Sequence, residues 1–292
     1  MADETTTDRN GDVMILARNN RGRLVACVWN QDMVNGLPSL PMREGDVVIC
    51  SYAKSGCHWT WETARLLMSH HEAVVQQTEK EQCMIEMSTL EKLEALKSPR
   101  LLNNHGFFDE QPLSEMIAKG VKVIFVYRNL KSVATSFYHH HTRFQEYNYS
   151  ATFDNYLSRF LDGLVDNDSA FSYLRGWEKG IAETPDLKVH VLSYEEMKKH
   201  PMEELRRLSK FLGGSEDEEF LKKVFEETDF DTMQKKKAKT TLYFDSNGLP
   251  VMYRKGTIGD WKNHFTVAQS ELMDSAIQKE LGDSKMFKFQ YE

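Results

Sequence analysis

The sequence predicts an α/β fold in which helices flank a central parallel sheet. Apolar runs of the length of one buried strand occur at residues 46–51, 121–127 and 187–192. Between them lie longer segments with helical spacing of apolar residues, and strands that alternate with helices are typical of parallel sheets. The 292 residues contain no internal repeat and no linker rich in Gly, Pro and Ser. We therefore expect residues 1–12 to be disordered and residues 13–292 to form a single domain.

The hydrophobic pattern and the turn residues predict the individual elements in order. The first expected elements are a hairpin of strands 13–17 and 24–29 about a turn at 19–22, an extended segment 36–41, and a strand 46–51 followed by a helix to about residue 70. A helix 89–98, with Ser88 and Glu91 as a capping box, and a strand 99–105 come next. The remaining elements are a strand 121–127 followed by a helix to residue 145, helices across 152–179, a strand 187–192 and a helical region from Ser193.

The most informative of these segments is the strand at 46–51, which passes through a Lys-Ser-Gly turn into a helix. The start of a helix offers backbone N–H groups without partners and a partial positive charge, and Lys54 adds a full charge. The turn therefore predicts an anion site. It differs from the common nucleotide-binding loop, because Lys54 precedes the only glycine of the turn, Gly56.

Three separate segments, in the same order, resemble the cytosolic sulfotransferase family. Residues 52–59, Tyr-Ala-Lys-Ser-Gly-Cys-His-Trp, are similar to the family's 5′-phosphosulfate loop, Tyr-Pro-Lys-Ser-Gly-Thr-Thr-Trp. Residues 121–139 resemble its 3′-phosphate segment, with Arg128 at the end of a strand and Ser136 in the following helix. Residues 254–262, Arg-Lys-Gly-Thr-Ile-Gly-Asp-Trp-Lys, fit its signature Arg-Lys-Gly-x-x-Gly-Asp-Trp-Lys. The resemblance implies a P-loop-kinase-like sulfotransferase fold.

The resemblance also implies a donor nucleotide, 3′-phosphoadenosine 5′-phosphosulfate (PAPS), whose product is adenosine 3′,5′-bisphosphate (PAP). Residues 98–105, Ser-Pro-Arg-Leu-Leu-Asn-Asn-His, are similar to the family segment that carries the catalytic histidine, so His105 and Lys54 are the expected catalytic residues. The residues expected to bind PAPS are Lys54, Ser55, Gly56, Cys57, His58, Trp59, Arg128, Ser136, Tyr194, Thr228, Phe230, Met233, Arg254, Lys255 and Gly256.

Further matches imply an acceptor pocket and a dimer contact. The side chains expected to wall a partly apolar pocket for a small hydroxyl- or amine-bearing acceptor are Met84, Met87, Phe107, Phe108, Phe137, Tyr138 and His140. The residues that fit the family's dimerisation motif are Lys262, Thr266, Val267 and Glu271, and they imply a homodimer. The identity of the acceptor does not follow from the sequence.

Composition excludes several other classes of protein. A net charge of −7 argues against a nonspecific nucleic-acid binder, whose surface is basic. The four cysteines show no paired spacing, so neither a disulfide framework nor a zinc site is expected, and no metal is implied by the motifs. The polar first residues do not have the pattern of a signal peptide, and no apolar run reaches membrane-spanning length. We therefore expect a cytoplasmic protein without nucleic-acid or membrane partners.

Departures from the family pattern leave two alternatives open. Cys57 and His58 replace two threonines of the loop, and Asn103 and Asn104 replace the Lys-Thr pair before His105. Loss of the lysine at 103 removes a cation beside the sulfonate, so one alternative is a pseudoenzyme that binds PAPS or PAP with weak or no transfer. The other is a P-loop kinase, although the glycines and the metal-binding Ser/Thr of that class are absent.

Overall fold

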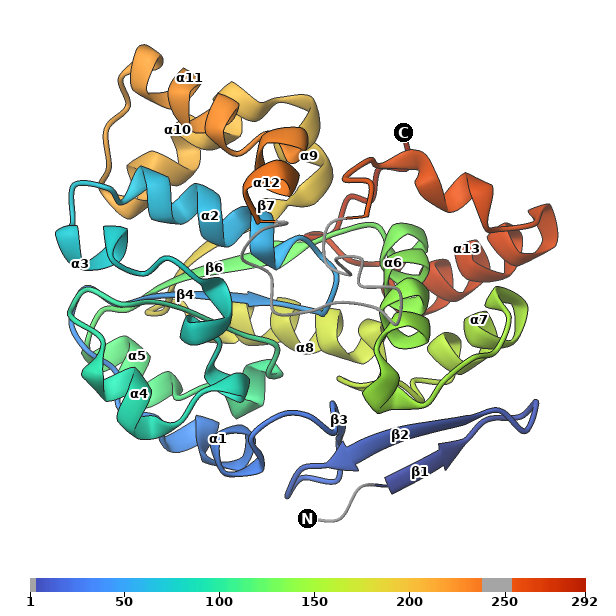
Figure 1. The fold of residues 1–292 in the computed structure, drawn as a ribbon. Helices are drawn as coiled ribbons and strands as arrows, with labels where there is room; N and C mark the ends of the chain where they lie inside the picture. Colours follow the sequence, from blue (N-terminus) through green and yellow to red (C-terminus); the bar gives the residue numbers. More distant parts are fainter. Residues whose placement is uncertain (1–3, 238–253) are drawn as a thin grey trace. The chain divides into compact units, whose positions relative to one another are not determined.

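The computed structural model describes residues 4–237 and 254–292. These residues divide into two compact units, each assembled from separate stretches of the chain (Figure 1). The sheet unit comprises Trp29–Tyr127 and Gly176–Asp229. The hairpin unit comprises the described residues of Met1–Val28, Arg128–Arg175 and Phe230–Glu292. A single domain over residues 13–292 stays a prediction.

The sheet unit is built on four parallel strands in the order β5-β4-β6-β7. The strands are β4 (Val47–Ser51), β5 (Leu101–Asn104), β6 (Lys122–Tyr127) and β7 (Lys188–Ser193). All five residues of β4 are buried, which explains the continuous apolar run in its sequence. The chain leaves β4 toward β5 and returns on the other side as β6. The predicted α/β fold with a central parallel sheet is confirmed.

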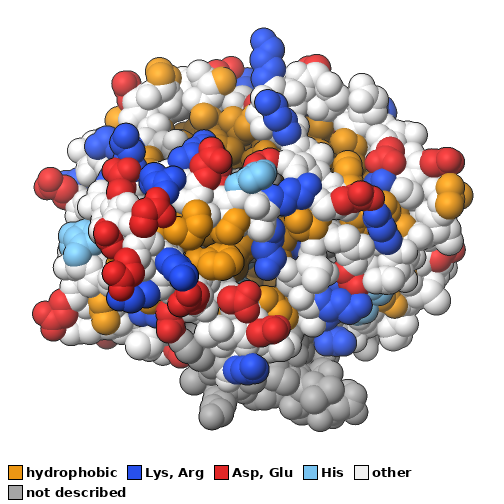
Figure 2. Space-filling model, turned by 90° about the horizontal axis from the view of Figure 1, so that it is seen from above, with side chains coloured by type: hydrophobic (Ala, Val, Ile, Leu, Met, Phe, Trp, Pro, Cys, Tyr) orange, Lys and Arg blue, Asp and Glu red, His pale blue; other side chains and the backbone are white. Residues whose placement is uncertain are grey.

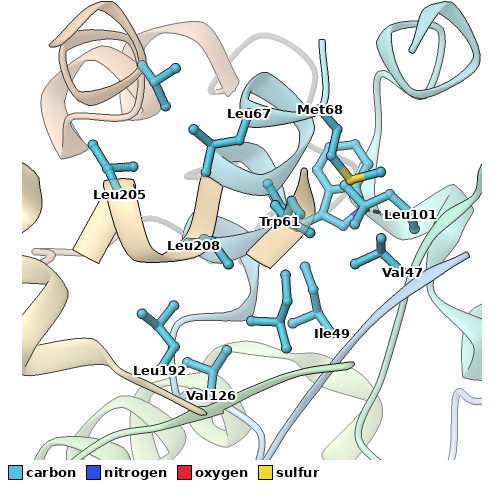
Figure 3. Close-up of a cluster of buried hydrophobic side chains, with 14 of the residues drawn as sticks. Val47, Ile49, Trp61, Leu67, Met68, Leu101, Val126, Leu192, Leu205 and Leu208 are labelled. Carbon is cyan, nitrogen blue, oxygen red and sulfur yellow. Dashed lines mark hydrogen bonds between the residues drawn. The ribbon is translucent and has the colours of Figure 1, made fainter. Parts of the chain in front are cut away.

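Four helices pack on one face of this sheet. They are α2 (Cys57–Leu67), α9 (Tyr194–Lys199), α10 (Pro201–Leu212) and α11 (Glu218–Glu227). Figure 3 shows Trp61 and Leu67 of α2 and Leu208 of α10 above strand residues that include Ile49 and Val126. Burial of each such aliphatic or aromatic side chain stabilises the unit by about 1.5–3 kcal/mol. This core fixes the start of α2 against the end of β4.

The remaining elements of the sheet unit are short, apart from α8 (Ala170–Glu183), which continues into it from the hairpin unit. Trp177 of α8 stacks on Phe125 of β6 with ring centroids 4.6 Å apart, so it covers the opposite face of the sheet. The short elements are α1 (Gln31–Gly36), η1 (Leu37–Ser39), α3 (Glu72–Val75), η2 (Lys80–Cys83), η3 (Ile85–Met87), α4 (Leu90–Ala95), η4 (Phe108–Glu110) and α5 (Leu113–Ala118).

Two local predictions in this unit are wrong. Residues 36–41 were expected to be extended, but Leu37–Ser39 form a 3₁₀ turn directly after α1, whose N-cap Asn30 accepts a hydrogen bond from the Asp32 amide at 3.1 Å. The predicted capping box at Ser88 is also wrong. Thr89 caps α4 instead and accepts from the Lys92 amide at 3.3 Å, whereas the Ser88 carbonyl accepts from the Asn30 side chain.

The hairpin unit combines an antiparallel sheet with helices. Its elements are β1 (Glu4–Thr7), β2 (Val13–Arg18), β3 (Leu24–Val25), α6 (Leu130–Arg143), η5 (Gln145–Tyr147), α7 (Phe153–Leu161), α12 (Phe230–Lys237), η6 (Gly259–Asn263) and α13 (Val267–Leu281). The predicted hairpin is confirmed as β2 and β3, although β3 has only two residues.

Residues 4–12 are ordered, which corrects the expectation of disorder for this part of residues 1–12, whereas residues 1–3 lie outside the described residues. Strand β1 pairs with β2, and the buried side chain of Arg159 in α7 contacts the segment. Its guanidinium donates to the Thr6 carbonyl at 3.2 Å and to the Asp8 carboxylate at 3.1 Å. These contacts join residues far apart in the chain, so local sequence patterns could not reveal them.

Charged side chains of both signs are mixed on the face drawn in Figure 2. No helix within residues 4–237 and 254–292 has both the length and the apolar character needed to cross a membrane. Nor do these residues contain a cluster of three or more His, Cys, Asp or Glu side chains arranged to hold a metal ion. The expectation that no metal takes part therefore stays a prediction.

Candidate active site

The predicted anion-binding turn connects β4 to α2. The Ser55 amide donates to the Tyr52 carbonyl at 3.2 Å and closes the turn. Lys54 has a φ of 67°, a left-handed conformation that is uncommon for a residue with a side chain, and Gly56 has a φ of 111°. The predicted strand, turn and helix are thus confirmed. Since the first amides of α2 have no partner within the helix, the turn fits an anionic group beside Lys54.

Two predicted aromatic residues lie against this turn. A Cβ atom on Gly56 would lie 2.7 Å from Cδ2 of Tyr194, so only glycine permits this close approach. The rings of Trp59 and Tyr194 meet edge to face with centroids 5.3 Å apart, and the Lys198 ammonium lies 5.1 Å from the Trp59 ring. The structure therefore brings Gly56, Trp59 and Tyr194 together, although Tyr194 comes from a different sequence motif.

The two residues that depart from the family pattern at the start of α2 have polar partners. Nε2 of His58 lies 2.7 Å from the Glu81 carboxylate. Burial and the charge of Lys80 lower the pKa of His58 to about 4, although Glu81 opposes them, so its imidazole is neutral at pH 7. Sγ of Cys57 lies 3.8 Å from Oδ1 of Asn103, and burial raises the pKa of its thiol. Neither residue is a cation at neutral pH.

His105 follows β5 and is buried. Its Nδ1 lies 2.8 Å from the Ser51 carbonyl, the last residue of β4. A carbonyl oxygen can only accept, so in the neutral ring the proton is on Nδ1 and Nε2 carries the lone pair. The ring stacks on Trp29 with centroids 5.9 Å apart, and the His105 amide donates to Oε1 of Glu86. These contacts fix the tautomer that a general base at Nε2 requires.

Asn104, which replaces the family's threonine, takes part in a buried amide pair. Its Nδ2 donates to Oε1 of Gln111 at 3.1 Å, and Nε2 of Gln111 donates back to Oδ1 of Asn104 at 2.9 Å. Nε2 of Gln111 also donates to the carbonyls of Gly106 and Phe107. Asn104 and Gln111 therefore fix the backbone that follows His105.

Sequence reasoning missed two buried charged residues near His105. Lys80 in η2 is 5% exposed, and Glu86 in η3 is 2% exposed. Burial raises the pKa of Glu86 to about 7, although the His105 amide and Lys80 oppose it. The sequence around Lys80, Thr-Glu-Lys-Glu-Gln, is polar throughout and carries no periodic signal. A local pattern could not have predicted that these side chains are buried.

The hairpin unit brings together part of the predicted 3′-phosphate site. Nη2 of Arg128 donates to the Thr257 carbonyl at 3.0 Å, and the Ser132 hydroxyl donates to the Ile258 carbonyl at 2.7 Å. Gly256 has a φ of 65°, and a Cβ atom there would collide with the ring of Phe230. The start of α6, the start of α12 and residues 254–259 therefore lie side by side.

The two cations of the signature segment interact with a carboxylate in the same unit. Arg254 lies 2.5 Å and Lys255 2.6 Å from the two oxygens of Asp260. Burial opposes ionisation of Asp260, yet hydrogen bonds from Lys255, Asn263 and Arg254 hold its pKa well below the usual range. Asp260 thus holds Arg254 and Lys255 beside Gly256.

Three other residues that are predicted to bind the donor lie in α6, at the end of α11 and in α12. In the sheet unit, Thr228 ends α11 and its hydroxyl donates to the Val224 carbonyl at 2.8 Å. In the hairpin unit, Met233 of α12 is buried and Ser136 of α6 is partly buried. That these three residues bind the donor stays a prediction.

The predicted pocket residues are divided between the units. In the sheet unit, Met84, Phe107 and Phe108 are buried, and Met87 is partly buried. The Met84 backbone forms a β-bridge to Asn103. The rings of Phe108 and Trp177 meet edge to face with centroids 5.2 Å apart. In the hairpin unit, Phe137 is fully buried against His141, whereas Tyr138 and His140 are partly exposed. That these residues wall a pocket stays a prediction.

The predicted dimer residues lie in η6 and in the first turns of α13, including its N-cap. Thr266 caps the helix and accepts from the Gln269 amide at 3.2 Å. The next residue, Val267, is 76% exposed, and Glu271 one turn later is also exposed. Lys262 pairs with the carboxylate of Glu292. An exposed large apolar side chain is typical of a contact surface, and the homodimer stays a prediction.

A family model described as a sulfotransferase domain matches residues 44–285. The chain belongs to the sulfotransferase family. It is 31% identical to Sulfotransferase 1C2 of Oryctolagus cuniculus over 271 residues, 87% of each chain, and 33% identical to Sulfotransferase 1A1 of Rattus norvegicus over 263 residues, 85% of this chain and 88% of the relative. Its structure matches that of mouse sulfotransferase SULT7A1 complexed with PAP, with a TM-score of 0.75, 26% identity and coverage of 92% and 95% of the two chains.

Family membership confirms three sequence predictions: the recognition of the family, the sulfotransferase fold and the enzyme class, EC 2.8.2. The protein is an enzyme of PAPS-dependent sulfuryl transfer. The same match argues against the kinase hypothesis. No observation favours the pseudoenzyme alternative.

Proposed function

We propose that this sulfotransferase transfers the sulfuryl group of PAPS to a hydroxyl or amine of a small, partly apolar acceptor, with His105 as general base. The observation that supports this proposal best is the hydrogen bond between Nδ1 of His105 and the Ser51 carbonyl. It places a histidine of defined tautomer at the end of the strand that leads into the Lys54 turn. Base and anion-binding turn are thus held by the same strand.

The bound donor supplies an activated sulfuryl group: as the acceptor's oxygen or nitrogen bonds to sulfur, the bond from sulfur to the 5′-phosphate oxygen breaks, and PAP leaves with the electron pair. Nε2 of His105 takes the acceptor's proton. Lys54 and the first amides of α2 stabilise the negative charge that grows on the 5′-phosphate. The protein contributes position and charge rather than a covalent step.

Other residues would hold the nucleotide. In the sheet unit, Trp59 and Tyr194 offer ring surfaces for the adenine beside Ser55, Gly56, Cys57 and His58, with Thr228 at the end of α11. In the hairpin unit, Arg128 offers a bidentate grip on the 3′-phosphate, assisted by Ser136, Arg254, Lys255 and the amide of Gly256, with Phe230 and Met233 nearby in α12. Contacts to a 3′-phosphate would select PAPS over ATP.

The acceptor, the assembly and the location belong to the same proposal. Met84, Met87, Phe107 and Phe108 in the sheet unit, and Phe137, Tyr138 and His140 in the hairpin unit, would contact the apolar part of the acceptor. A homodimer would form through Lys262, Thr266, Val267 and Glu271. We propose a cytoplasmic location from the family resemblance.

Replacement of His105 tests the proposed base. His105→Ala should lower turnover by about 10²-fold or more, because no other group then takes the acceptor's proton, while the Kd for PAP stays near that of the parent. Turnover is measured with radiolabelled PAPS and the Kd by calorimetry. His200→Ala, at an exposed position, is the control and should match the parent. Full activity in His105→Ala would assign proton transfer to another group.

A further inference from the structure

Lys80 is a buried cation without a carboxylate partner in the described part of the chain. Four cationic side chains are buried there: Lys80, Arg100, Lys131 and Arg159. The other three form ion pairs, Arg100 with Asp46, Lys131 with Asp274 and Arg159 with Asp8. Among residues 4–237 and 254–292, the hydrogen-bond partner of the Lys80 ammonium is a thioether, Sδ of Met84 at 3.7 Å. Burial of a charge without a partner is costly, so an anion at this position would be strongly favoured.

The surroundings of Lys80 place it beside the anion-binding turn. Nδ2 of Asn103 donates to the Lys80 carbonyl at 3.2 Å, and Oδ1 of Asn103 faces Sγ of Cys57 at the start of α2. The next residue, Glu81, binds His58. After burial, the charge of Lys80 is the largest influence on the pKa values of Cys57 and His58, and it lowers both. The ammonium thus acts on the first turn of α2.

The residue at position 103 connects the placement of Lys80 with the binding of the sulfonate. The family pattern has a lysine there beside the sulfonate, whereas Asn103 is uncharged and its amide is bound to the backbone of Lys80. We propose that Lys80 binds the sulfonate oxygens of PAPS and supplies, from η2, the cation that position 103 lacks. This inference rests on the proposed function. It extends that function by assigning the sulfonate contact to a residue outside the family motifs quoted above.

The other described ionisable groups near Lys80 do not form an ion pair with its ammonium. Glu81 is held by His58, and Oε1 of Glu86 accepts the His105 amide. Cys57 and Cys83 are buried thiols whose pKa values burial raises, so they stay neutral at pH 7. Glu81 and Glu86 feel the charge of Lys80, but in the described part of the chain neither carboxylate forms an ion pair with its ammonium, so Lys80 can still bind the sulfonate.

The test compares two ligands that differ by the sulfonate alone. Lys80→Met keeps the length of the side chain and removes its charge, so its affinity for PAPS should fall about tenfold while its affinity for PAP stays within about twofold of the parent. Both values are measured by calorimetry without acceptor. Lys122→Met removes a partly buried lysine at the start of β6, the opposite end of the sheet, and should leave both affinities unchanged.

A second variant relocates the charge. Adding Asn103→Lys to Lys80→Met returns a cation to the position used in the family pattern, and the affinity for PAPS should recover by most of the lost factor. This double variant, or Lys80→Gln, also serves if Lys80→Met does not fold. Recovery with the charge at 103 is not expected if Lys80 only supports the local fold.

Two results would overturn the inference: equal losses of PAPS and PAP affinity in Lys80→Met, or unchanged affinity for PAPS. The comparison does not depend on turnover. If the parent binds PAPS but transfers sulfate to no acceptor, the proposed function fails, whereas the difference between PAPS and PAP still decides the role of Lys80.

Discussion

At the scale of single residues, the environment of His105 is set by groups that the sequence motif does not contain. The Ser51 carbonyl fixes its tautomer, Trp29 stacks on its ring, and Glu86 accepts a hydrogen bond from its backbone amide. Glu86 differs from the others because it titrates near neutral pH. Its second oxygen, Oε2, is buried and has no hydrogen-bond partner among the described residues, which is unfavourable for the charged form.

Glu86 should therefore make stability depend on pH. Its pKa is about 7 in the folded protein, above the value near 4.5 of an unperturbed carboxyl group. A raised pKa contributes stability that is present below about pH 4.5 and is lost as the pH rises through about 7. The free energy of unfolding of the parent should thus fall between about pH 5 and pH 8 by an amount on the order of 2–3 kcal/mol relative to Glu86→Gln, which cannot ionise.

Urea unfolding of the parent and of Glu86→Gln at several pH values measures this difference. Glu91→Gln, on the exposed first turn of α4, is the control and should follow the pH profile of the parent. Parallel profiles for the parent and Glu86→Gln would show that the carboxyl group keeps its ordinary pKa. The surrounding charges that act on Glu86 are Lys80 and Glu110, both of which stay unchanged in the comparison.

At the scale of elements, the junction of β6 and α6 places Arg128 beside residues 254–259. If Arg128 binds the 3′-phosphate, PAP should stabilise the protein much more than AMP, which lacks that group. A ligand at about 100 times its Kd adds roughly 2.7 kcal/mol of stability, so a large difference in Tm is expected at equal concentrations. Arg128→Ala should remove most of it.

The melting temperatures are read by calorimetry with PAP, with AMP and without ligand. Arg143→Ala, at the far end of α6, removes an arginine from the same helix and should keep the preference for PAP. Equal shifts with PAP and AMP in the parent would contradict the assignment of the 3′-phosphate site to Arg128.

Helix α13 carries the proposed dimer contact at its first residue. Val267 is exposed by 76%, and a single apolar residue can dominate a small interface. Val267→Glu should therefore convert a dimer into monomers in light scattering, whereas Leu272→Glu, at a position 53% exposed further along α13, should not. A parent that is already monomeric at micromolar concentration would contradict the dimer.

The elements also show what a sequence can reveal. The strand, turn and helix around Lys54 were predicted because their signals are local: a buried run, a turn with glycine, and a helix that begins at once. Strand β1 was missed because Arg159, which holds it, lies in another part of the chain. Lys80 was missed because the polar sequence around it carries no periodic signal, and Asn103, which donates to its carbonyl, lies 23 residues away in the chain.

At the scale of the whole molecule, the chain is a sulfotransferase although its phosphate loop is altered. The family match covers residues 44–285, and the tautomer of His105 suits a general base. The replacements at 57, 58, 103 and 104 have polar partners within the sheet unit rather than leaving gaps. Binding of the nucleotide alone would not distinguish an enzyme from a pseudoenzyme. Only transfer does.

The most direct test follows radioactive sulfur from labelled PAPS to a panel of phenols, aliphatic alcohols and amines without added metal. We expect a labelled product with at least one class of acceptor, formed in proportion to enzyme and reduced about 10²-fold or more in His105→Ala. Tight binding of PAP without a labelled product from any acceptor would contradict the assignment as a sulfotransferase and favour a nucleotide-binding protein without transfer activity.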